Sequence, residues 1–346
     1  MIRHTTSGMI AATQSESPMI SSIAELEACL GAPGLPAKLK AIDHLDSLAA
    51  AWIAMSPLMS AMTAGPTGAV KATLGGGDPG FAAAEDANTM TVARAALDDA
   101  NAIDAGDGIA FLFLAPGVTE TFRVNGRVEK VSATHVGVRV DECFVHCGKA
   151  LIRSDFWQPQ PPAHTDLPGA ARLCVLGTTD GTGNVDASPK GDPAGFLMKL
   201  DDKTFALPDR LGNRRADGHR NVIAHDRIAM IAFAPGATAA IELTGRARLT
   251  RDTTMLSRMT VAGKDPLLAT VIAIDRARTY DSQALHNARI WGTDRMEAPR
   301  PNPGATLAAH INLSQERNHM PAAERFAVTP EGANQRLAES YKTGLY

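Results

Sequence analysis

The stretch IAFLFLAPGVTETFRVNGRVEKV, residues 109–131, decides the fold, because the chain repeats its pattern as IAMIAFAPGATAAIELTGRARLT from Ile228. Each copy begins with an apolar run, turns at Ala-Pro-Gly and continues with apolar residues at roughly alternate positions. This pattern predicts a buried β-strand, a turn and a second strand. The two copies lie 119 residues apart.

Two further echoes occur in the same order. VRVDECFVHCGKALIRSDFW and IAIDRARTYDSQALHNARIW align Trp157 with Trp291, a shift of 134 residues, and residues 77–81 resemble residues 191–196. The larger shift predicts an insertion in the second copy between its two echoes. Three echoes in one order indicate a duplication, so we expect two copies of one mostly-β domain.

The remaining segments set the expected boundaries. We expect a disordered leader at 1–22, a first domain at 23–158, a Pro-rich linker at 159–168, a second domain at 169–296 and a tail at 297–346 that ends in a helix near 333–342. Apolar residues near helical spacing predict helices at 23–30 and 35–55, with Asp43 and Asp46 on a solvated helix face.

Composition excludes several classes. The net charge of −3 gives no general reason to bind nucleic acid. The chain has no apolar run of membrane-spanning length and no convincing signal peptide, and its four scattered cysteines fit a reducing compartment, so a cytoplasmic location is expected. A Gly-x-Ser-x-Gly elbow and a Gly-x-Gly-x-x-Gly fingerprint are both absent from the sequence.

The chemistry is concentrated in residues 184–221, NVDASPKGDPAGFLMKLDDKTFALPDRLGNRRADGHRN. Ser-Pro-Lys-Gly from Ser188 and Asp-Arg-Leu-Gly-Asn-Arg-Arg from Asp209 each follow a β-like segment. Two basic, turn-forming clusters at adjacent strand ends are what a phosphate cradle requires. Any one of these bases alone would more often be a solvated surface residue.

These strings, together with HCGKALIRSDFW from His146, resemble the pyridoxamine 5′-phosphate oxidase-like family of FMN-binding split barrels. The resemblance covers about residues 35–346. It implies a mainly β fold with flanking helices, here two fused FMN-binding split barrels that form an intrachain pseudo-dimer. Members of the family are usually homodimers of six-stranded barrels with FMN at the dimer interface.

The two copies have lost different parts of this pattern. Ser188-Pro189-Lys190-Gly191 of the second copy corresponds to Thr-Leu-Gly-Gly in the first, and the second copy replaces His146, Lys149 and Arg153 by Tyr280, Gln283 and Asn287. Each copy therefore lacks what the other retains. We expect one composite site, with the cradle from the second copy and the His146–Trp157 wall from the first.

The resemblance and the clustering together predict a set of FMN-binding residues. They are Ser188, Lys190, Gly191, Pro208, Asp209, Arg210, Asn213, Arg215, Arg220, His146, Lys149, Arg153 and Trp157. The function implied is an FMN-dependent oxidoreductase acting on a small molecule, with NAD(P)H or a flavin reductase as a possible electron donor. Catalytic residues are not assigned, although His146 and Lys149 are candidates. The chain is expected to be a monomeric pseudo-dimer or a higher homo-oligomer.

Several alternatives stay open at this point. The chain could be a non-catalytic flavin-binding or sensing protein, or a haem-binding split barrel with His146 as an axial ligand. Trp157 could lie in the core or beside the flavin. A metal at Cys143, His146 and Cys147 is disfavoured because no second ligand pair has zinc-like spacing, and Cys147 is more plausible as a structural thiol than as a nucleophile.

Overall fold

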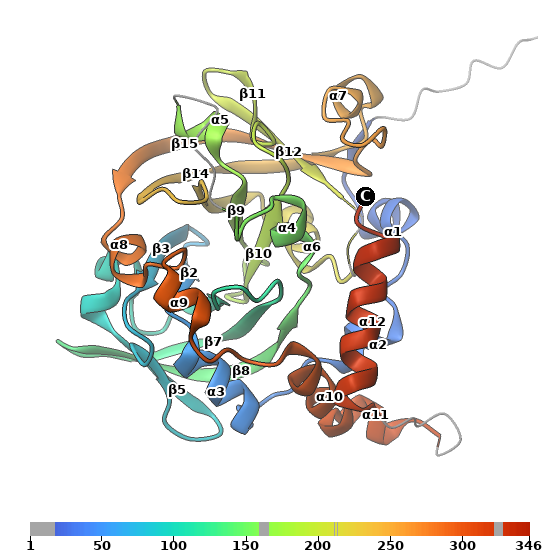
Figure 1. Cartoon of the computed structure of the whole chain (residues 1–346). Coiled ribbons are helices and arrows are strands. Elements are labelled where there is room, and N and C mark those ends of the chain that lie inside the picture. Colours follow the sequence, from blue (N-terminus) through green and yellow to red (C-terminus); the bar gives the residue numbers. More distant parts are fainter. Residues whose placement is uncertain (1–17, 159–165, 211, 213, 322–327) are drawn as a thin grey trace, which may run out of the picture.

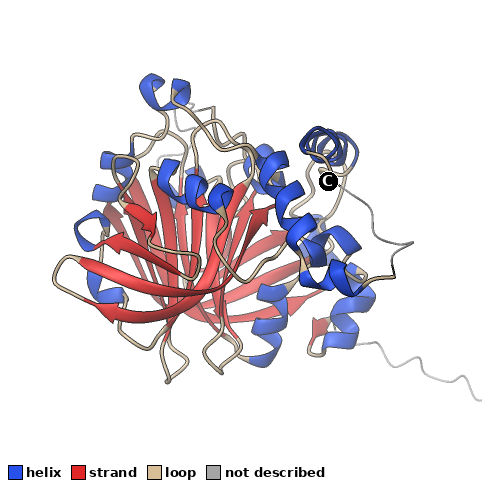
Figure 2. Ribbon diagram, turned by 90° about the horizontal axis from the view of Figure 1, so that it is seen from below, coloured by secondary structure: helices blue, strands red, loops and turns tan. Residues whose placement is uncertain are grey.

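The computed structural model describes residues 18–158, 166–210, 212, 214–321 and 328–346. Most of the expected leader and linker therefore lie outside the described residues. The fold is mainly β, with two antiparallel sheets and helices around them (Figures 1 and 2). This confirms the predicted fold class.

Each half of the chain builds one sheet. The first sheet consists of β2 (Leu58–Ala64), β3 (Val70–Gly76), β4 (Ala82–Ala84), β5 (Thr89–Ala93), β6 (Gly108–Leu114), β7 (Thr121–Val131) and β8 (His135–His146). The second consists of β9 (Leu173–Thr179), β10 (Val185–Gly191), β11 (Met198–Asp201), β12 (Thr204–Asp209), β13 (Arg227–Phe233), β14 (Ala239–Thr250) and β15 (Leu268–Asp281), with the short β1 (Met19–Ile20) beside β14.

The two sheets share one strand order. It is β3-β2-β6-β7-β8-β5-β4 in the first and β10-β9-β13-β14-β15-β12-β11 in the second. Bulges at Asn125/Gly126 and at Thr244/Gly245 fall at equivalent places in β7 and β14. A Cβ on Gly126 or Gly245 would lie about 2 Å from a carbonyl oxygen of the neighbouring strand, so both bulges need glycine. Internal duplication would produce this correspondence.

The insertion predicted in the second copy lies between β14 and β15. In the first copy, β7 and β8 are joined by a tight turn at residues 132–134. In the second, residues 251–267 separate the equivalent strands and include α7 (Thr253–Ser257). Carbonyl groups of this segment accept hydrogen bonds from a side chain of the candidate site.

Three apolar clusters hold the molecule together. One fills the first barrel around Trp52, Phe111 and Phe122, and another fills the second around Met230 and Leu243. The third lies between the sheets and joins side chains of β2, β3 and β6 to side chains of β9, β10 and β13. Burial of apolar surface between the halves stabilises their association, much as it does in an obligate dimer.

The helices lie around and between these barrels. They are α1 (Ile23–Leu30), α2 (Leu35–Leu39), α3 (Ser47–Met55), α4 (Lys149–Arg153), α5 (Leu167–Ala170), α6 (Asp217–Ala224), α8 (Gln283–Ala288), α9 (Thr293–Glu297), α10 (Pro303–Leu313), α11 (Gln315–His319) and α12 (Pro330–Thr343), with two 3₁₀ turns, η1 (Arg94–Ala96) and η2 (Ala100–Ala102). Among the described residues, no helix combines the length and apolar character of a membrane span.

Two sequence expectations about the N-terminal segments need correction. The single helix expected at 35–55 is broken into α2 and α3, because the Asp46 side chain accepts a hydrogen bond from the Ala49 amide and so caps α3 instead of lying on a helix face. Met19 and Ile20, placed in the leader, pair with β14, and Leu26 of α1 is buried in the second barrel. The N-terminal segment therefore packs on the second domain, not the first.

The C-terminal segment packs on the opposite half. Side chains of α10 and α12 form a small apolar cluster with Leu39 of α2. The expected C-terminal helix is present and begins at Pro330, with Thr329 as its cap. It runs from α10 toward α1, along the side of the molecule that carries the site described next (Figure 1).

Candidate functional site

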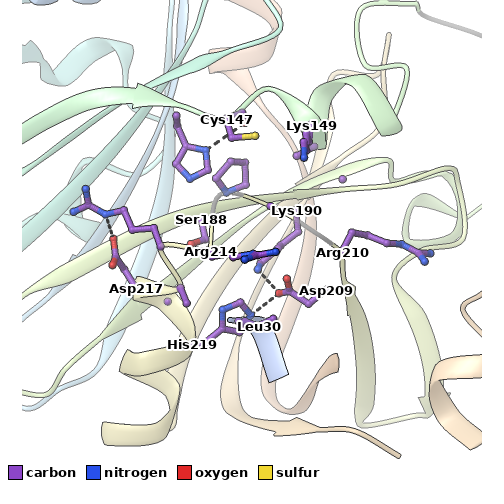
Figure 3. Close-up of a pocket in the computed structure, with 18 of the residues that line it drawn as sticks. Leu30, Cys147, Lys149, Ser188, Lys190, Asp209, Arg210, Arg214, Asp217 and His219 are labelled. Carbon is purple, nitrogen blue, oxygen red and sulfur yellow. Dashed lines mark hydrogen bonds and ion pairs between the residues drawn. The ribbon is translucent and has the colours of Figure 1, made fainter. Parts of the chain in front are cut away.

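A cleft lies where α4 of the first barrel meets β10 of the second. The volume of this cleft is about 110 Å³. Lining residues come from β7, β8 and α4 of the first half and from β10, β12 and α6 of the second (Figure 3). The cleft is thus formed by both halves of the chain.

Close backbone contact sets the distance between α4 and β10. A Cβ placed on Gly191 would lie 2.3 Å from the carbonyl oxygen of Ala150. Only glycine fits at this point of β10, and any larger residue would push α4 away. The Ser-Pro-Lys-Gly string therefore needs its glycine for packing across the two halves.

Lys190 and His219 converge on one carboxylate. The Lys190 Nζ donates to Asp209 Oδ2 at 2.5 Å, and His219 Nε2 lies 2.5 Å from the same oxygen (Figure 3). Burial by itself raises the pKa of Asp209, but His219 and Lys190 outweigh it and hold that pKa well below its ordinary value. Asp209 is therefore an anion that orients two cradle side chains.

Arg123 of β7 reaches into the site from the first barrel. It is 2% exposed and pairs with Asp186 of β10 and Asp217 at the start of α6. Arg215 pairs with the same Asp217 and, at 2.7 Å, with Glu142 of β8. The two arginines and three carboxylates form one network across the interface.

Arg210 is committed to structural bonds. Its guanidinium donates to Asp192 at 2.8 Å and to the carbonyl oxygens of Met259 and Lys264, both in the insertion between β14 and β15. It points away from the centre of the cleft in Figure 3. Arg153 of α4 likewise donates to the Gly191 carbonyl oxygen at 3.1 Å and pairs with Asp192. These contacts tie the insertion and α4 to the end of β10.

Two cations of the cleft have no ion-pair partner among the described residues. Lys149 opens α4 and is 6% exposed, and burial lowers its pKa. Arg214 lies in the segment before α6, with a φ of 59°. An incoming anion would meet these two charges first, since the other bases already bind carboxylates or carbonyl groups.

The backbone before α6 also suits an anion. Arg214 and Ala216 both have positive φ, which is uncommon without glycine, and Arg215 between them does not. When positive and negative φ values alternate in this way, successive backbone N–H groups point to the same side and form a concave anion-binding site. The N-cap of α6, Ala216, makes no side-chain cap, so the first amides of a helix that lines the cleft keep their donors.

His146 ends β8 beside the cleft. Burial, with Lys40 and Arg123 nearby, lowers its pKa well below the ordinary value, so the imidazole is neutral at physiological pH. Its Nδ1 lies 3.4 Å from the Cys147 carbonyl oxygen. No group of three or more possible metal ligands occurs in the described part of the chain.

The structure gathers most of the predicted residues. Ten of them line the cleft: His146, Lys149, Arg153, Ser188, Lys190, Gly191, Pro208, Asp209, Arg210 and Arg215. Two do not. Arg220 pairs with Glu27 of α1 at 2.6 Å, and Trp157 donates from Nε1 to the Val118 carbonyl oxygen and packs on Phe156. Asn213 lies outside the described residues.

Sequence reasoning missed Arg123, Arg214, Asp217 and His219, all of which line the cleft. The sequence did contain a sign that Arg123 belongs to the site. The second copy has Glu242 at the equivalent place in β14, so the base is present only in the first copy. Arg214, Asp217 and His219 lie within the stretch quoted for the cradle. Nothing in the spacing alone distinguished them from surface residues.

The pseudo-equivalent position at the other end of the interface has the same scaffold. There α8 of the second half lies on β3 of the first, and a Cβ on Gly76 would come within 2.4 Å of the Ala284 carbonyl oxygen. The segment through η1 and η2 fills this end. Leu97 forms a β-bridge with Gly75, and Asp98 accepts from the Ser282 hydroxyl at 2.6 Å and from the Ala284 amide at 2.8 Å.

Comparison with known families identifies the second half. Residues 161–288 match the family described as Pyridoxamine 5'-phosphate oxidase. Over these residues the second barrel is similar to the pyridoxamine 5′-phosphate oxidase family. The match spans β9 to β15 together with the cradle, and the first barrel shares the strand order of the second.

Comparison with solved structures found proteins that are similar to about a third of this chain. HupZ from Group A Streptococcus is 19% identical and covers 33% of this chain and 88% of its own, with a TM-score of 0.26. General Stress Protein 26 from Bacillus anthracis is 15% identical over 34% of this chain and 90% of its own, and an F420 reductase is 13% identical over 34% and 98%, both with TM-scores of 0.26. Comparison with curated proteins gave no match.

Proposed function

We propose that the chain is an FMN-dependent oxidoreductase with one composite flavin site, in the cleft between α4 and β10. The observation that carries this proposal is the meeting, in one cleft, of the cradle from the second half and the His146–Arg153 segment from the first. The second half resembles a family of flavin enzymes, and the first would supply the wall that the second lacks. We infer that the chain is a fused duplicate that has kept one of two original sites.

The charge of the cleft suits a phosphomonoester. Seven bases line it, namely Arg123, Lys149, Arg153, Lys190, Arg210, Arg214 and Arg215. Five carboxylates pair with them, namely Glu142, Asp186, Asp192, Asp209 and Asp217. The excess of two positive charges matches a phosphate group, which carries about −1.5 to −2 near neutral pH.

Lys149 and Arg214 would contribute the direct contacts. Neither has an ion-pair partner in the described part of the chain, and Arg214 stands at the start of the segment whose amides turn to one side. Lys190, oriented by Asp209, and the Ser188 hydroxyl would contact the rest of the cofactor. Arg210 and Arg153 would act by positioning β10 and α4, because their donors are already used.

When bound, the flavin supplies the hydride or electron transfer, and the protein supplies binding, orientation and electrostatics. The bases and the backbone N–H groups before α6 would hold the phosphate end of an FMN in the cleft. His146, held neutral, could accept or donate one hydrogen bond without adding charge beside the cleft. No proton transfer is assigned to it, because hydride transfer at a flavin needs no protein acid.

The test is turnover of the purified chain. We expect the absorption spectrum of a bound flavin, and repeated reduction and reoxidation in air when NADPH, or NADH with a flavin reductase, is supplied. A flavin that binds in stoichiometric amount but never turns over with any donor would instead indicate a carrier or sensor. A haem spectrum, or a protein with no affinity for FMN, would contradict the proposal.

A further inference from the structure

A second cavity of about 280 Å³ lies under α12. It is enclosed by α2, α10, α12 and the end of β8, and we call it the α12 cavity. Figure 1 shows α12 beside α2, with α10 near its lower end. The cavity shares His146 and Cys147 with the wall of the FMN cleft but extends away from it, into the helices of the first half.

The wall of the α12 cavity is mainly apolar. Leu307 and Ile311 of α10 and Leu337 of α12 provide most of the large side chains, together with Val145 of β8 and Val328. Its size is near the lower end of typical ligand sites. A molecule that fills it must therefore be small and mostly apolar.

Lys40 and Arg336 are the cationic side chains of the cavity wall, and Lys40 is the buried one of the two. Lys40, which follows α2 directly, is 6% exposed and lines the cavity. The Nζ donates one hydrogen bond, to the Val145 carbonyl oxygen at 2.9 Å, and lies 4.7 Å from the centre of the Phe144 ring. No carboxylate of the described residues pairs with it. In the ammonium form, two of its three hydrogen-bond donors therefore have no partner among the described residues.

The groups around Lys40 are mostly basic or neutral. Those that line the cavity are His146, Cys147, Arg336, Ser340 and Tyr341, without an aspartate or glutamate. The Tyr341 hydroxyl is already engaged, since it donates to Glu120 and accepts from the Gly148 amide. From α10, His310 faces the Lys40 backbone with Nδ1 at 3.2 Å from its carbonyl oxygen.

Burial lowers the pKa of Lys40 to about 7. The guanidinium groups of Arg215 and Arg123 also lie over the Phe144 ring, and their positive charges lower the pKa of Lys40 further. Cys147 and Asp217 act on this pKa in the opposite direction. The amine is therefore largely neutral above pH 8. An anion placed beside it would restore its charge.

We propose that the α12 cavity binds a small apolar monocarboxylate, with its chain along α10 and α12 and its carboxylate at the Lys40 amine. A carboxylate can accept hydrogen bonds from these two donors, and no acidic group in the wall opposes it. A neutral alcohol or hydrocarbon would fill the same space but would not form the charge-assisted contact that a carboxylate makes with the amine. This proposal does not rest on the flavin, because every residue it uses belongs to the α12 cavity.

Calorimetric titration of the full chain with octanoate at pH 8.5 tests it. At this pH Lys40 is mostly neutral in the unliganded protein, and His146 is too weak a base to contribute. Binding of octanoate should therefore take up close to one proton per chain. Titrations in two buffers of different ionisation enthalpy measure this proton uptake. Affinity should fall as the pH rises from 7 to 10. Along the series butanoate, hexanoate and octanoate it should rise about fourfold for each added CH₂ group.

Two variants separate the carboxylate contact from the cavity itself. Lys40→Met should weaken octanoate about tenfold or more and abolish proton uptake, while 1-octanol binding stays unchanged. Ser340→Trp, on the exposed edge of α12, should weaken both ligands by filling the cavity. Lys38→Met, at an exposed lysine of α2 close to Lys40 in the sequence, is the matched control and should alter neither.

Several results would contradict carboxylate binding in the α12 cavity. Equal octanoate affinity in Lys40→Met and the unaltered protein would overturn the proposal, as would binding without proton uptake or no binding at millimolar octanoate. Tight 1-octanol binding with no preference for octanoate would assign the cavity to neutral ligands instead. The flavin content of every sample is measured in parallel, so that loss of the FMN site is recognised separately.

Discussion

At one end of the interface between the halves, α4 of the first lies on β10 of the second, and at the other end α8 of the second lies on β3 of the first. Gly191 and Gly76 allow the same close backbone contact in each. The side chains around them differ. One end is an open cleft lined by bases, and the other is occupied by the segment through η1 and η2.

The difference shows which features the scaffold needs and which the site needs. Both ends keep the glycine, although Lys190 is replaced by Gly75 and Lys149 by Gln283. The residue equivalent to Arg123 at the filled end is Glu242, a carboxylate that pairs with Arg278 and provides no positive charge for an anion. Packing has therefore been preserved at both ends, while the bases have been kept only where a ligand would use them.

The largest expected effect comes from removing the two unpaired cations of the open end. Lys149→Ala together with Arg214→Ala should weaken FMN binding by about 100-fold or more, since each removes a charge-assisted contact to phosphate. Equilibrium dialysis or fluorescence titration measures this. Gln283→Ala at the filled end is the matched control and should leave FMN affinity unchanged. If both variants bound FMN alike, the cleft would not be the site.

The glycine pair gives the next effect. Gly191→Ala and Gly76→Ala should each lower the free energy of unfolding by about 1–3 kcal/mol, because each Cβ would strike a backbone carbonyl oxygen of the facing helix. Urea denaturation measures it. Of the two, only Gly191→Ala should also weaken FMN binding. An equal loss of FMN in both would mean that the alanine acts through global stability.

Asp98 tests the filled end. Asp98→Ala should cost about 1–2 kcal/mol of stability, since the Ser282 hydroxyl and the Ala284 amide lose their acceptor. Thermal unfolding, with the FMN content measured alongside, is the assay. FMN binding should be unaffected. A second equivalent of FMN bound by this variant would show that the segment blocks a functional site instead of replacing a lost one.

The smallest effect concerns Asp209. Its pKa is depressed in the folded chain, so the stability it contributes is fully present above about pH 4, its ordinary range, and is lost as the pH falls below it. The stability difference between the unaltered chain and Asp209→Asn should therefore stay constant from pH 6 to about pH 4 and shrink as the pH is lowered further. Asp275→Asn, at an exposed position on β15, is the control and should show no such trend.

Much of the fold was predictable because it depends on local pattern. The alternation in 121–131 matches β7, and the difference between the two echo shifts correctly placed the insertion before β15. The break between α2 and α3 was missed, because Asp46 in a helix-like run gave no sign that it would cap. Packing of the N-terminal segment on the second barrel was also missed, since it depends on contacts between residues more than 200 positions apart.

The composition of the site was predictable to a similar degree. Ten of the residues that cluster and motif named lie in one cleft, and their role as FMN ligands stays a prediction. Cluster and motif could not show that Arg210 is used up by Asp192 and by carbonyl groups of the insertion, because those partners lie up to 54 positions away. Nor could they separate Arg220, which points to α1, from its neighbours. Charge pairing of this kind is decided by the folded geometry.

The ratio of flavin to chain in the purified protein tests the central claim most directly. With one open end and one filled end, the chain saturated with FMN should hold one FMN per chain, and the Lys149→Ala, Arg214→Ala variant should hold none under the same conditions. A ratio of two would mean that the filled end also binds. A ratio of zero, or one FMN shared by two chains, would contradict an intrachain composite site.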